Sequence, residues 1–204
     1  MYIFVLRYES KKRSIDKNMV IIKEITEEKD SIPTKIQFRP ATLADVAAMM
    51  EIIHQAQEAL KVLGVNQWQN GYPTPDIIRQ DIRNGNACVL TDGDAVIATS
   101  AVIFNDEPTY DRIYEGEWLS TGEFVVVHRI AVDNRRKQKG TASCLFREVE
   151  KMALQKNIHS FKIDTHKDNV PMRKALEKNG FSYCGRIILR DGNDRVAYEK
   201  RIEE

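Results

Sequence analysis

The sequence lacks the features that mark several classes of protein. It has three cysteines in 204 residues, far apart and without the CxxC spacing of a zinc site or redox motif. It has no run of the eighteen or so apolar residues that a membrane helix needs. The apolar start at 2–6 is short, and its basic residues follow it, which is the wrong polarity for a secretory signal. These absences favour a reducing, cytoplasmic location and predict no metal and no membrane partner.

The chain also has almost no net charge, with 31 Lys and Arg against 30 Asp and Glu. Domains whose main partner is nucleic acid usually carry a large positive excess. We therefore expect no nucleic-acid partner, and we expect a monomer or a homodimer. The length suits one core of ordinary size.

What the chain does have is one long apolar run, at 124–132, followed by a basic turn at 135–139. The run is rich in β-branched residues, as in a central strand that is buried on both faces. After the turn, apolar residues recur at the spacing of a helix face. These residues are Ala142, Leu145, Phe146, Val149, Met152 and Ala153.

A strand, a basic turn and a helix in this order predict an anion site. The first N–H groups of a helix have no partner within the helix, and phosphates bind there readily. Gly140 leaves the backbone open to a ligand, and Lys137 and Lys139 add positive charge. The alternative is an ordinary solvated basic turn.

The rest of the chain divides at residue 35. At 1–34, two short apolar runs alternate with charge clusters, which predicts an extension that adds an edge strand or frays, with Met19 as an alternative start. From Lys35 the pattern is regular and predicts one domain over 35–204. Thr42 with Asp45 indicates a helix start, and Thr74-Pro75 indicates another. Further strands are predicted at 36–39, 87–91, 95–104, 160–164, 187–189 and 196–200, with a short helix before Gly180.

Two motifs carry a resemblance to a known family. Lys137-Gln138-Lys139-Gly140-Thr141-Ala142 resembles the acyl-CoA pyrophosphate loop of the GNAT N-acetyltransferase superfamily, with Arg129–Asp133 similar to its central strand. The segment from Asn169 to Gly180-Phe181 resembles the family's second motif. The resemblance covers about 35–204. It implies the α/β (α+β) acyl-CoA N-acyltransferase fold, a mixed, mostly antiparallel sheet of about six or seven strands flanked by about four helices.

The resemblance also implies acetyl-CoA as co-substrate and a set of residues that hold it. Backbone groups of Ile130, Ala131 and Val132 would hold the pantetheine arm, and Asn169 would bond it from the other side. The pyrophosphate would lie against Lys137, Gln138, Lys139, Gly140, Thr141 and Ala142. Lys137 replaces the usual Arg or Gln, keeping a charge but not a planar fork.

Acetyl transfer to an amine needs a base for the amine and an acid for the thiolate. Histidine is the side chain with an ordinary pKa near neutrality, so His128 is the candidate base, with Glu107 and Glu123 as further candidates. Regular alternation, without a β-bulge, would put His128 on the face shared with Val126 and Ile130, whereas a bulge would point its side chain elsewhere. The alternative to a catalytic role is a hydrogen-bonded core histidine. The family's usual acid, a Tyr, is replaced by Leu176, which leaves Tyr183 or water for that role.

Four aromatic residues on two loops could form the acceptor pocket. They are Trp68, Tyr72, Tyr110 and Trp118. The alternative for each is packing in the core or at its rim.

Two functions follow from these observations. The first is an N-acetyltransferase that transfers acetyl from acetyl-CoA to a primary amine of a small molecule or peptide, by direct attack in a ternary complex. The second, motivated by Leu176, is a non-catalytic acyl-CoA-binding sensor or adaptor. A nucleotide-binding Rossmann domain is disfavoured, because no GxGxxG follows an early strand.

Overall fold

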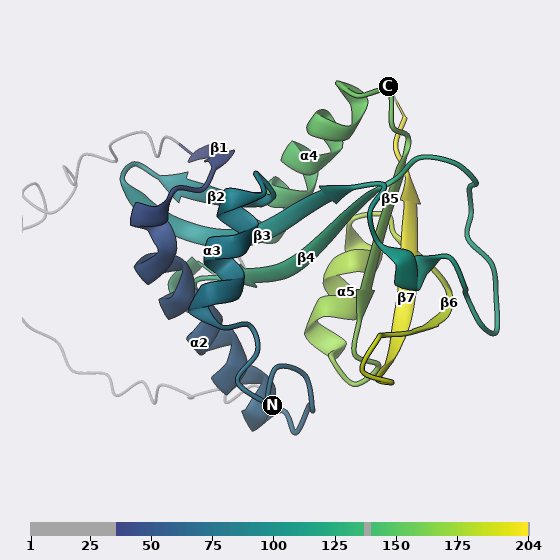
Figure 1. Ribbon diagram of the computed structural model, residues 1–204, viewed down its shortest axis with the longest axis horizontal. Helices are drawn as coiled ribbons and strands as arrows, with labels where there is room; N and C mark the ends of the chain where they lie inside the picture. The colour runs from purple at the N-terminus through teal and green to yellow at the C-terminus, as the bar shows by residue number, and fades with distance from the viewer. Residues whose placement is uncertain (1–35, 137–139, 204) are drawn as a thin grey trace, which may run out of the picture. The chain divides into compact units, whose positions relative to one another are not determined.

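The computed structural model describes residues 36–136 and 140–203, which form a seven-stranded sheet in the order β1-β2-β3-β4-β5-β7-β6 (Figure 1). The predicted extension at 1–34 and the loop residues Lys137, Gln138 and Lys139 lie outside the described residues. The strands are β1 (Ile36–Pro40), β2 (Ala87–Asp92), β3 (Ala95–Phe104), β4 (Val125–Val132), β5 (Ser160–Thr165), β6 (Ser182–Ile188) and β7 (Asp194–Arg201).

The sheet is mixed and mostly antiparallel, as predicted. Only β4 and β5 run parallel, and they pair only through Val125 with Phe161 and Val126 with Lys162. Beyond this point β4 continues to Val132 and β5 to Thr165, but the two strands are no longer paired. The sheet therefore opens between its two central strands, as the splayed halves in Figure 1 show.

Four α-helices cover the sheet in the described part of the chain: α2 (Val46–Val62), α3 (Pro75–Arg83), α4 (Thr141–Leu154) and α5 (Val170–Lys178). Alternate residues of β2 point to opposite faces and show which helices cover each face. Cys88 and Leu90 belong to the core cluster of α4 and α5. Ala87 and Val89 belong to the core cluster of α2 and α3, on the other face. None of the described helices is long and apolar enough to cross a membrane.

The predicted helix starts are confirmed. Thr42 and Asp45 form a capping box, although the first turn, η2 (Leu43–Asp45), is a 3-10 turn rather than α-helix. Both oxygens of Asp45 accept hydrogen bonds from Arg39, at 2.8 and 2.9 Å, and this pairing lowers the pKa of Asp45. Thr74 caps α3, with Pro75 at its first position.

A β-bulge interrupts β4. His128 pairs with Ala101 and Ala131 pairs with Thr99, so two residues of β4 stand opposite one residue of β3. Arg129, in the bulge, has a φ of +54°. The expectation of regular alternation is therefore wrong: His128 shares a face with Val126 but not with Ile130, which packs against the α4–α5 core.

Candidate active site

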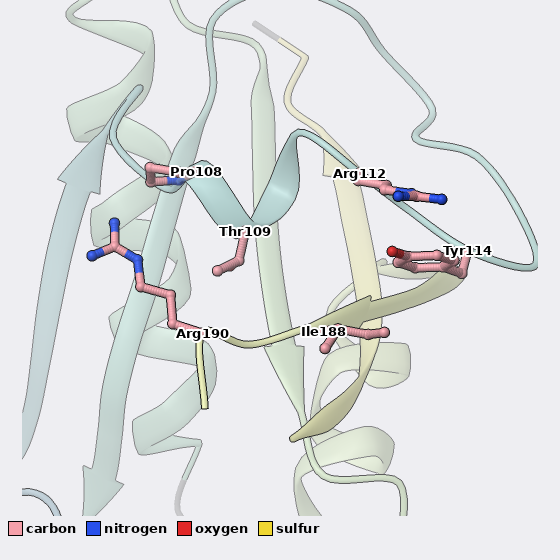
Figure 2. A pocket seen from close by; sticks show the side chains of 6 residues that line it. All are labelled: Pro108, Thr109, Arg112, Tyr114, Ile188 and Arg190. Carbon is pink, nitrogen blue, oxygen red and sulfur yellow. The ribbon is translucent and has the colours of Figure 1, made fainter. Parts of the chain in front are cut away.

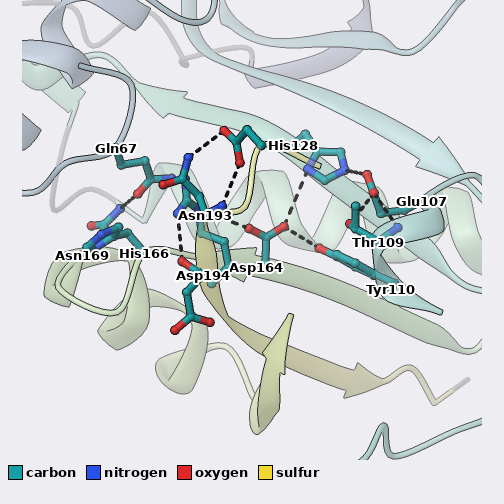
Figure 3. Close-up of polar contacts among 12 residues, drawn as sticks. Gln67, Glu107, Thr109, Tyr110, His128, Asp164, His166, Asn169, Asn193 and Asp194 are labelled. Atoms are coloured by element: carbon teal, nitrogen blue, oxygen red, sulfur yellow. Dashed lines mark hydrogen bonds and ion pairs between the residues drawn. The ribbon is translucent and has the colours of Figure 1, made fainter. Parts of the chain in front are cut away.

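His128 and Glu107 form a close pair at the opening of the sheet. His128 Nε2 lies 2.8 Å from Glu107 Oε2, and both side chains are 18% exposed. Glu107 caps the short helix η3 (Pro108–Tyr110), and its Oε1 accepts from the Thr109 hydroxyl at 2.5 Å (Figure 3). Burial alone would raise the pKa of Glu107, but hydrogen bonds from His128 and Thr109 outweigh it and lower the pKa to about 2. Glu107 is therefore ionised near neutral pH.

This pairing fixes the proton on the imidazole. An ionised carboxylate only accepts hydrogen bonds, so neutral His128 must donate from Nε2 to Glu107 and leave Nδ1 as the free acceptor. Nδ1 lies 4.0 Å from Oδ1 of Asp164 on β5. A proton taken up at Nδ1 would therefore give an imidazolium flanked by two carboxyl groups.

Asp164 is the site residue that the sequence pattern missed. Its side chain is 9% exposed, Tyr110 donates its hydroxyl to Oδ1 at 2.8 Å, and Arg195 Nε lies 3.9 Å from Oδ2. Burial raises the pKa of this carboxyl group, while His128, Tyr110 and Arg195 oppose the rise. The polar residues of β5, at 160, 162 and 164, alternate with apolar ones, and this pattern predicts a strand without singling out Asp164.

The position of this group follows from the sheet. His128 stands two residues after Val126, and Asp164 two residues after Lys162, the last paired residues of β4 and β5. Their side chains therefore face each other where the strands begin to diverge. Both come from the face of the sheet that η3 covers.

The bulge places a second polar group beside the first. Arg129 Nη2 donates to Asp81 Oδ1 of α3 at 2.8 Å, and its Nε lies 2.7 Å from Oδ2. Arg129 Nη1 donates to the hydroxyl of Tyr72 at 2.9 Å. Of the four predicted acceptor residues, Tyr72 is thus the one whose hydroxyl is bonded to Arg129, the residue next to His128.

The other predicted acceptor aromatics are packed. Tyr110 is 2% exposed, and its ring lies 5.1 Å from that of Trp118, whose Nε1 donates to the Tyr110 carbonyl. Trp68, between α2 and α3, packs against the core of those helices. The structure therefore does not gather the four aromatics in one cluster.

Two further candidates for proton transfer lie apart from His128. The Tyr183 ring is 5.8 Å from that of Tyr198, which belongs to the α4–α5 core on the other face. Glu123, just before the start of β4, accepts a hydrogen bond from the Asn105 side chain. Leu176, at the position of the family's usual Tyr, is fully buried in the α4–α5 core.

Within the described chain, the residues predicted to hold acetyl-CoA lie on β4, at the start of α4 and at the start of α5. Ile130, Ala131 and Val132 lie where β4 has left β5, so their β5-facing backbone groups have no strand partner in the described chain. Gly140 precedes α4 with a φ of +77° and no side-chain cap, and a Cβ there would meet nothing within 4 Å. Thr141 and Ala142 begin α4, and the first N–H groups of a helix have no partner within the helix.

Asn169 caps α5, accepting from Met172 N, while its Nδ2 donates to Gln67 at 3.1 Å. This bond joins α5 to the loop after α2. Over the described stretches 36–136 and 140–203, no three His, Cys, Asp or Glu side chains are grouped as a metal site.

Comparison with known proteins agrees with this arrangement. Residues 48–181 match the model of the acetyltransferase (GNAT) family. A GNAT-family acetyltransferase of Streptococcus agalactiae is 35% identical, with a TM-score of 0.76 over 83% of this chain and 96% of that one. A putative acetyltransferase of Staphylococcus aureus is 22% identical, with a TM-score of 0.62 over 82% and 99%.

The PaiA N-acetyltransferase of Thermoplasma acidophilum, solved in complex with coenzyme A, is 13% identical, with a TM-score of 0.60 over 81% of this chain and 98% of that chain. Among the curated proteins there is no match. The extent of the family match and the 35% identity, together with the fold, show that this chain belongs to the GNAT acetyltransferase family.

Proposed function

We propose that the protein transfers an acetyl group from acetyl-CoA to a primary amine of a small molecule or peptide, by direct attack in a ternary complex. One observation carries this proposal: His128, whose Nε2 is held by the carboxylate of Glu107, stands where the two central strands diverge and has Nδ1 as its second ring nitrogen. An amine must lose a proton to attack a thioester, and this atom can accept it. The coenzyme A complex of a structural relative supports the choice of donor.

Each group has a role in this scheme. Glu107 holds Nε2 of His128 and stabilises the imidazolium, while Asp164 stands 4.0 Å from Nδ1. The backbone groups of Ile130, Ala131 and Val132 and the first turn of α4 would hold the pantetheine and the pyrophosphate. Acetyl-CoA supplies the thioester, and its carbonyl oxygen would need an N–H donor as negative charge develops.

Position 176 has no tyrosine that could act as the acid. The residue there is Leu176, which is buried in the core. This supports the second candidate, a non-catalytic acyl-CoA-binding sensor or adaptor. We favour the enzyme because the His128–Glu107 pair provides a group that can take up the proton of the attacking amine. The cysteines, which form no disulfide in the described chain, agree with a cytoplasmic setting.

The test combines calorimetry with a thiol-release assay. We expect acetyl-CoA to bind, and CoA to be released when a suitable member of a panel of amines, amino acids, peptides and aminoglycosides is added. Binding without release across the panel would favour the sensor. Absence of binding would remove both candidates.

A further inference from the structure

A pocket of about 270 Å³ lies beside η3, the short helix that Glu107 caps (Figure 2). Six residues line it: Pro108, Thr109, Arg112, Tyr114, Ile188 and Arg190. Thr109 connects it to the candidate active site, because its hydroxyl bonds Glu107, which in turn bonds His128. A molecule held in this pocket would therefore lie against the short helix whose cap, Glu107, is the partner of the candidate base.

The lining has a positive charge that nothing in it balances. Arg112 and Arg190 are its only ionisable side chains apart from the Tyr114 phenol, and neither forms an ion pair with any residue of 36–136 or 140–203. In Figure 2, the Arg190 guanidinium lies on the side of Pro108 and that of Arg112 on the side of Tyr114. This local charge contrasts with the nearly neutral chain.

The walls of the pocket are anchored. Tyr114 exchanges two backbone hydrogen bonds of 2.8 Å with Arg186 of β6, and Arg112 lies 4.7 Å above the Tyr114 ring. The backbones approach so closely that a Cβ on Gly185 would come within 2.6 Å of the Tyr114 carbonyl oxygen. On the other side, Leu189 N donates to the carbonyl of Asn193 across the β6–β7 turn and holds the base of Arg190.

We infer that this pocket binds a carboxylate of the acceptor, so that the acceptor is an amino acid or another small amine that carries a carboxylate. A guanidinium fork binds a carboxylate with two parallel, charge-assisted hydrogen bonds. The Tyr114 ring, Ile188 and Pro108 offer apolar surface for a short carbon chain, and Thr109 offers a hydroxyl. The volume suits a small group rather than a folded protein segment.

Arg190 should matter more than Arg112. Pro108, on its side of the pocket, directly follows Glu107, so a carboxylate there would leave the amine of the same molecule near His128. The Arg112 guanidinium already stacks on Tyr114 and stands farther along. Arg112 would then serve acceptors with a second or more distant anionic group.

This inference rests on the proposed function, and its test separates the two. Each amino acid is assayed beside its carboxamide, which keeps the amine and side chain but removes the negative charge. The wild type should prefer the carboxylates in kcat/KM. Arg190→Ala should lower kcat/KM by about ten- to a hundredfold for the carboxylate, mainly through KM, and change the carboxamide less than about twofold.

Arg147→Ala is the matched control, since Arg147 is an exposed arginine on α4, over the opposite face. Carboxamides used as well as carboxylates by the wild type, or equal losses for both in Arg190→Ala, would overturn the inference. So would a carboxylate-specific loss in Arg147→Ala.

Binding of the acetylated products, N-acetylamino acids against N-acetylamino acid amides, is measured by calorimetry in parallel. Charge-selective product binding that Arg190→Ala removes would support the pocket even if no thiol is released, and the proposed function alone would then fail. Product binding without charge selectivity would overturn the pocket and leave the proposed function standing.

Discussion

The two faces of the sheet differ in what they bury. On the face of α4 and α5, the core cluster consists of apolar side chains and includes Phe146, Phe161 and Leu176. On the other face, the half formed by β5 and β7 buries Lys162 and Glu199 and nearly buries Asp164. The segment between β3 and β4 covers these charges and provides their partners.

The contacts beneath this segment are specific. Glu199 accepts from the Leu119 N–H at 2.6 Å and from the hydroxyls of Ser120 and Ser160. Lys162 Nζ lies 4.5 Å from the centres of the Trp118 and Phe124 rings, and burial lowers its pKa. Because one face supplies the apolar packing, the other can hold charged groups in fixed positions. The following experiments test this division of roles, beginning with the largest expected effect.

The first change is His128→Ala on the polar face. Loss of general-base help should lower kcat by about 10²–10⁴ with little change in the melting temperature. Activity of the wild type should fall as the pH drops and the imidazole gains a proton, and the variant should lose this acidic limb. A pH–rate profile measures both, with His54→Ala, an exposed histidine on α2, as the control. A variant that keeps the limb and most of its rate would remove His128 from the mechanism.

The second change is Leu176→Ala on the apolar face. It leaves a cavity in a fully buried position and should lower the free energy of unfolding by about 2–5 kcal/mol. The folded fraction should keep its kcat, because Leu176 belongs to the α4–α5 core on the face opposite His128. Denaturant unfolding and rates per folded molecule test this, and Leu176→Met should cost less than about 1.5 kcal/mol. A loss of kcat in Leu176→Met at unchanged stability would break the division between the faces.

The third change concerns Gly140, at the start of α4. Gly140→Trp should weaken acetyl-CoA binding at least tenfold, about 1.4 kcal/mol or more, because the side chain would fill the space above the first turn of the helix. The residue has a φ of +77°, so any side chain adds backbone strain. Gly140→Ala carries the same strain without the bulk and should bind nearly normally. Equal affinities of the two variants by calorimetry would exclude this turn as the pyrophosphate site.

The smallest expected effect is on the pH dependence of stability and concerns the ion pair of Arg39 and Asp45, before the start of α2. Arg39 lowers the pKa of Asp45, so the stabilisation from this pair is fully present above the unfolded-state pKa and is lost as the pH falls through the lower folded-state value. Asp45→Asn should therefore lower stability by about 1–2 kcal/mol at pH 7 and flatten its decline in acid. Asp76→Asn, which removes an exposed partner of Arg79, should change neither. A similar acid decline in wild type and Asp45→Asn would refute the assignment.

The sequence predicted the parts that depend on local patterns. The caps at Thr42 and Thr74, the central strand at 125–132 and the helix after Gly140 are confirmed, because each has a short-range signal. His128 and Glu107 were proposed separately, and the structure brings them within 2.8 Å. Their joint role in proton transfer stays a prediction.

Features that depend on distant segments were missed. Lys162, Asp164 and Glu199 are charged residues of a kind that usually faces solvent, and the segment between β3 and β4 covers them. The sequence left open whether this strand has a bulge and did not predict its position, since the residue with positive φ is Arg129 and not a glycine. Its conformation accompanies its ion pair with Asp81, 48 residues earlier in the chain.

The bulge has a consequence for anyone who redesigns this strand. It shifts the phase of the side-chain pattern by one residue, so the rule for odd and even positions reverses at Arg129. A library aimed at the reactive face would vary positions 126, 128, 129 and 131, whereas positions 125, 127, 130 and 132 would alter the α4–α5 core. Deleting Arg129 would remove the bulge and leave both sets on their present faces, whereas inserting one residue after the bulge would exchange the sets beyond the insertion and turn apolar side chains toward the reactive face.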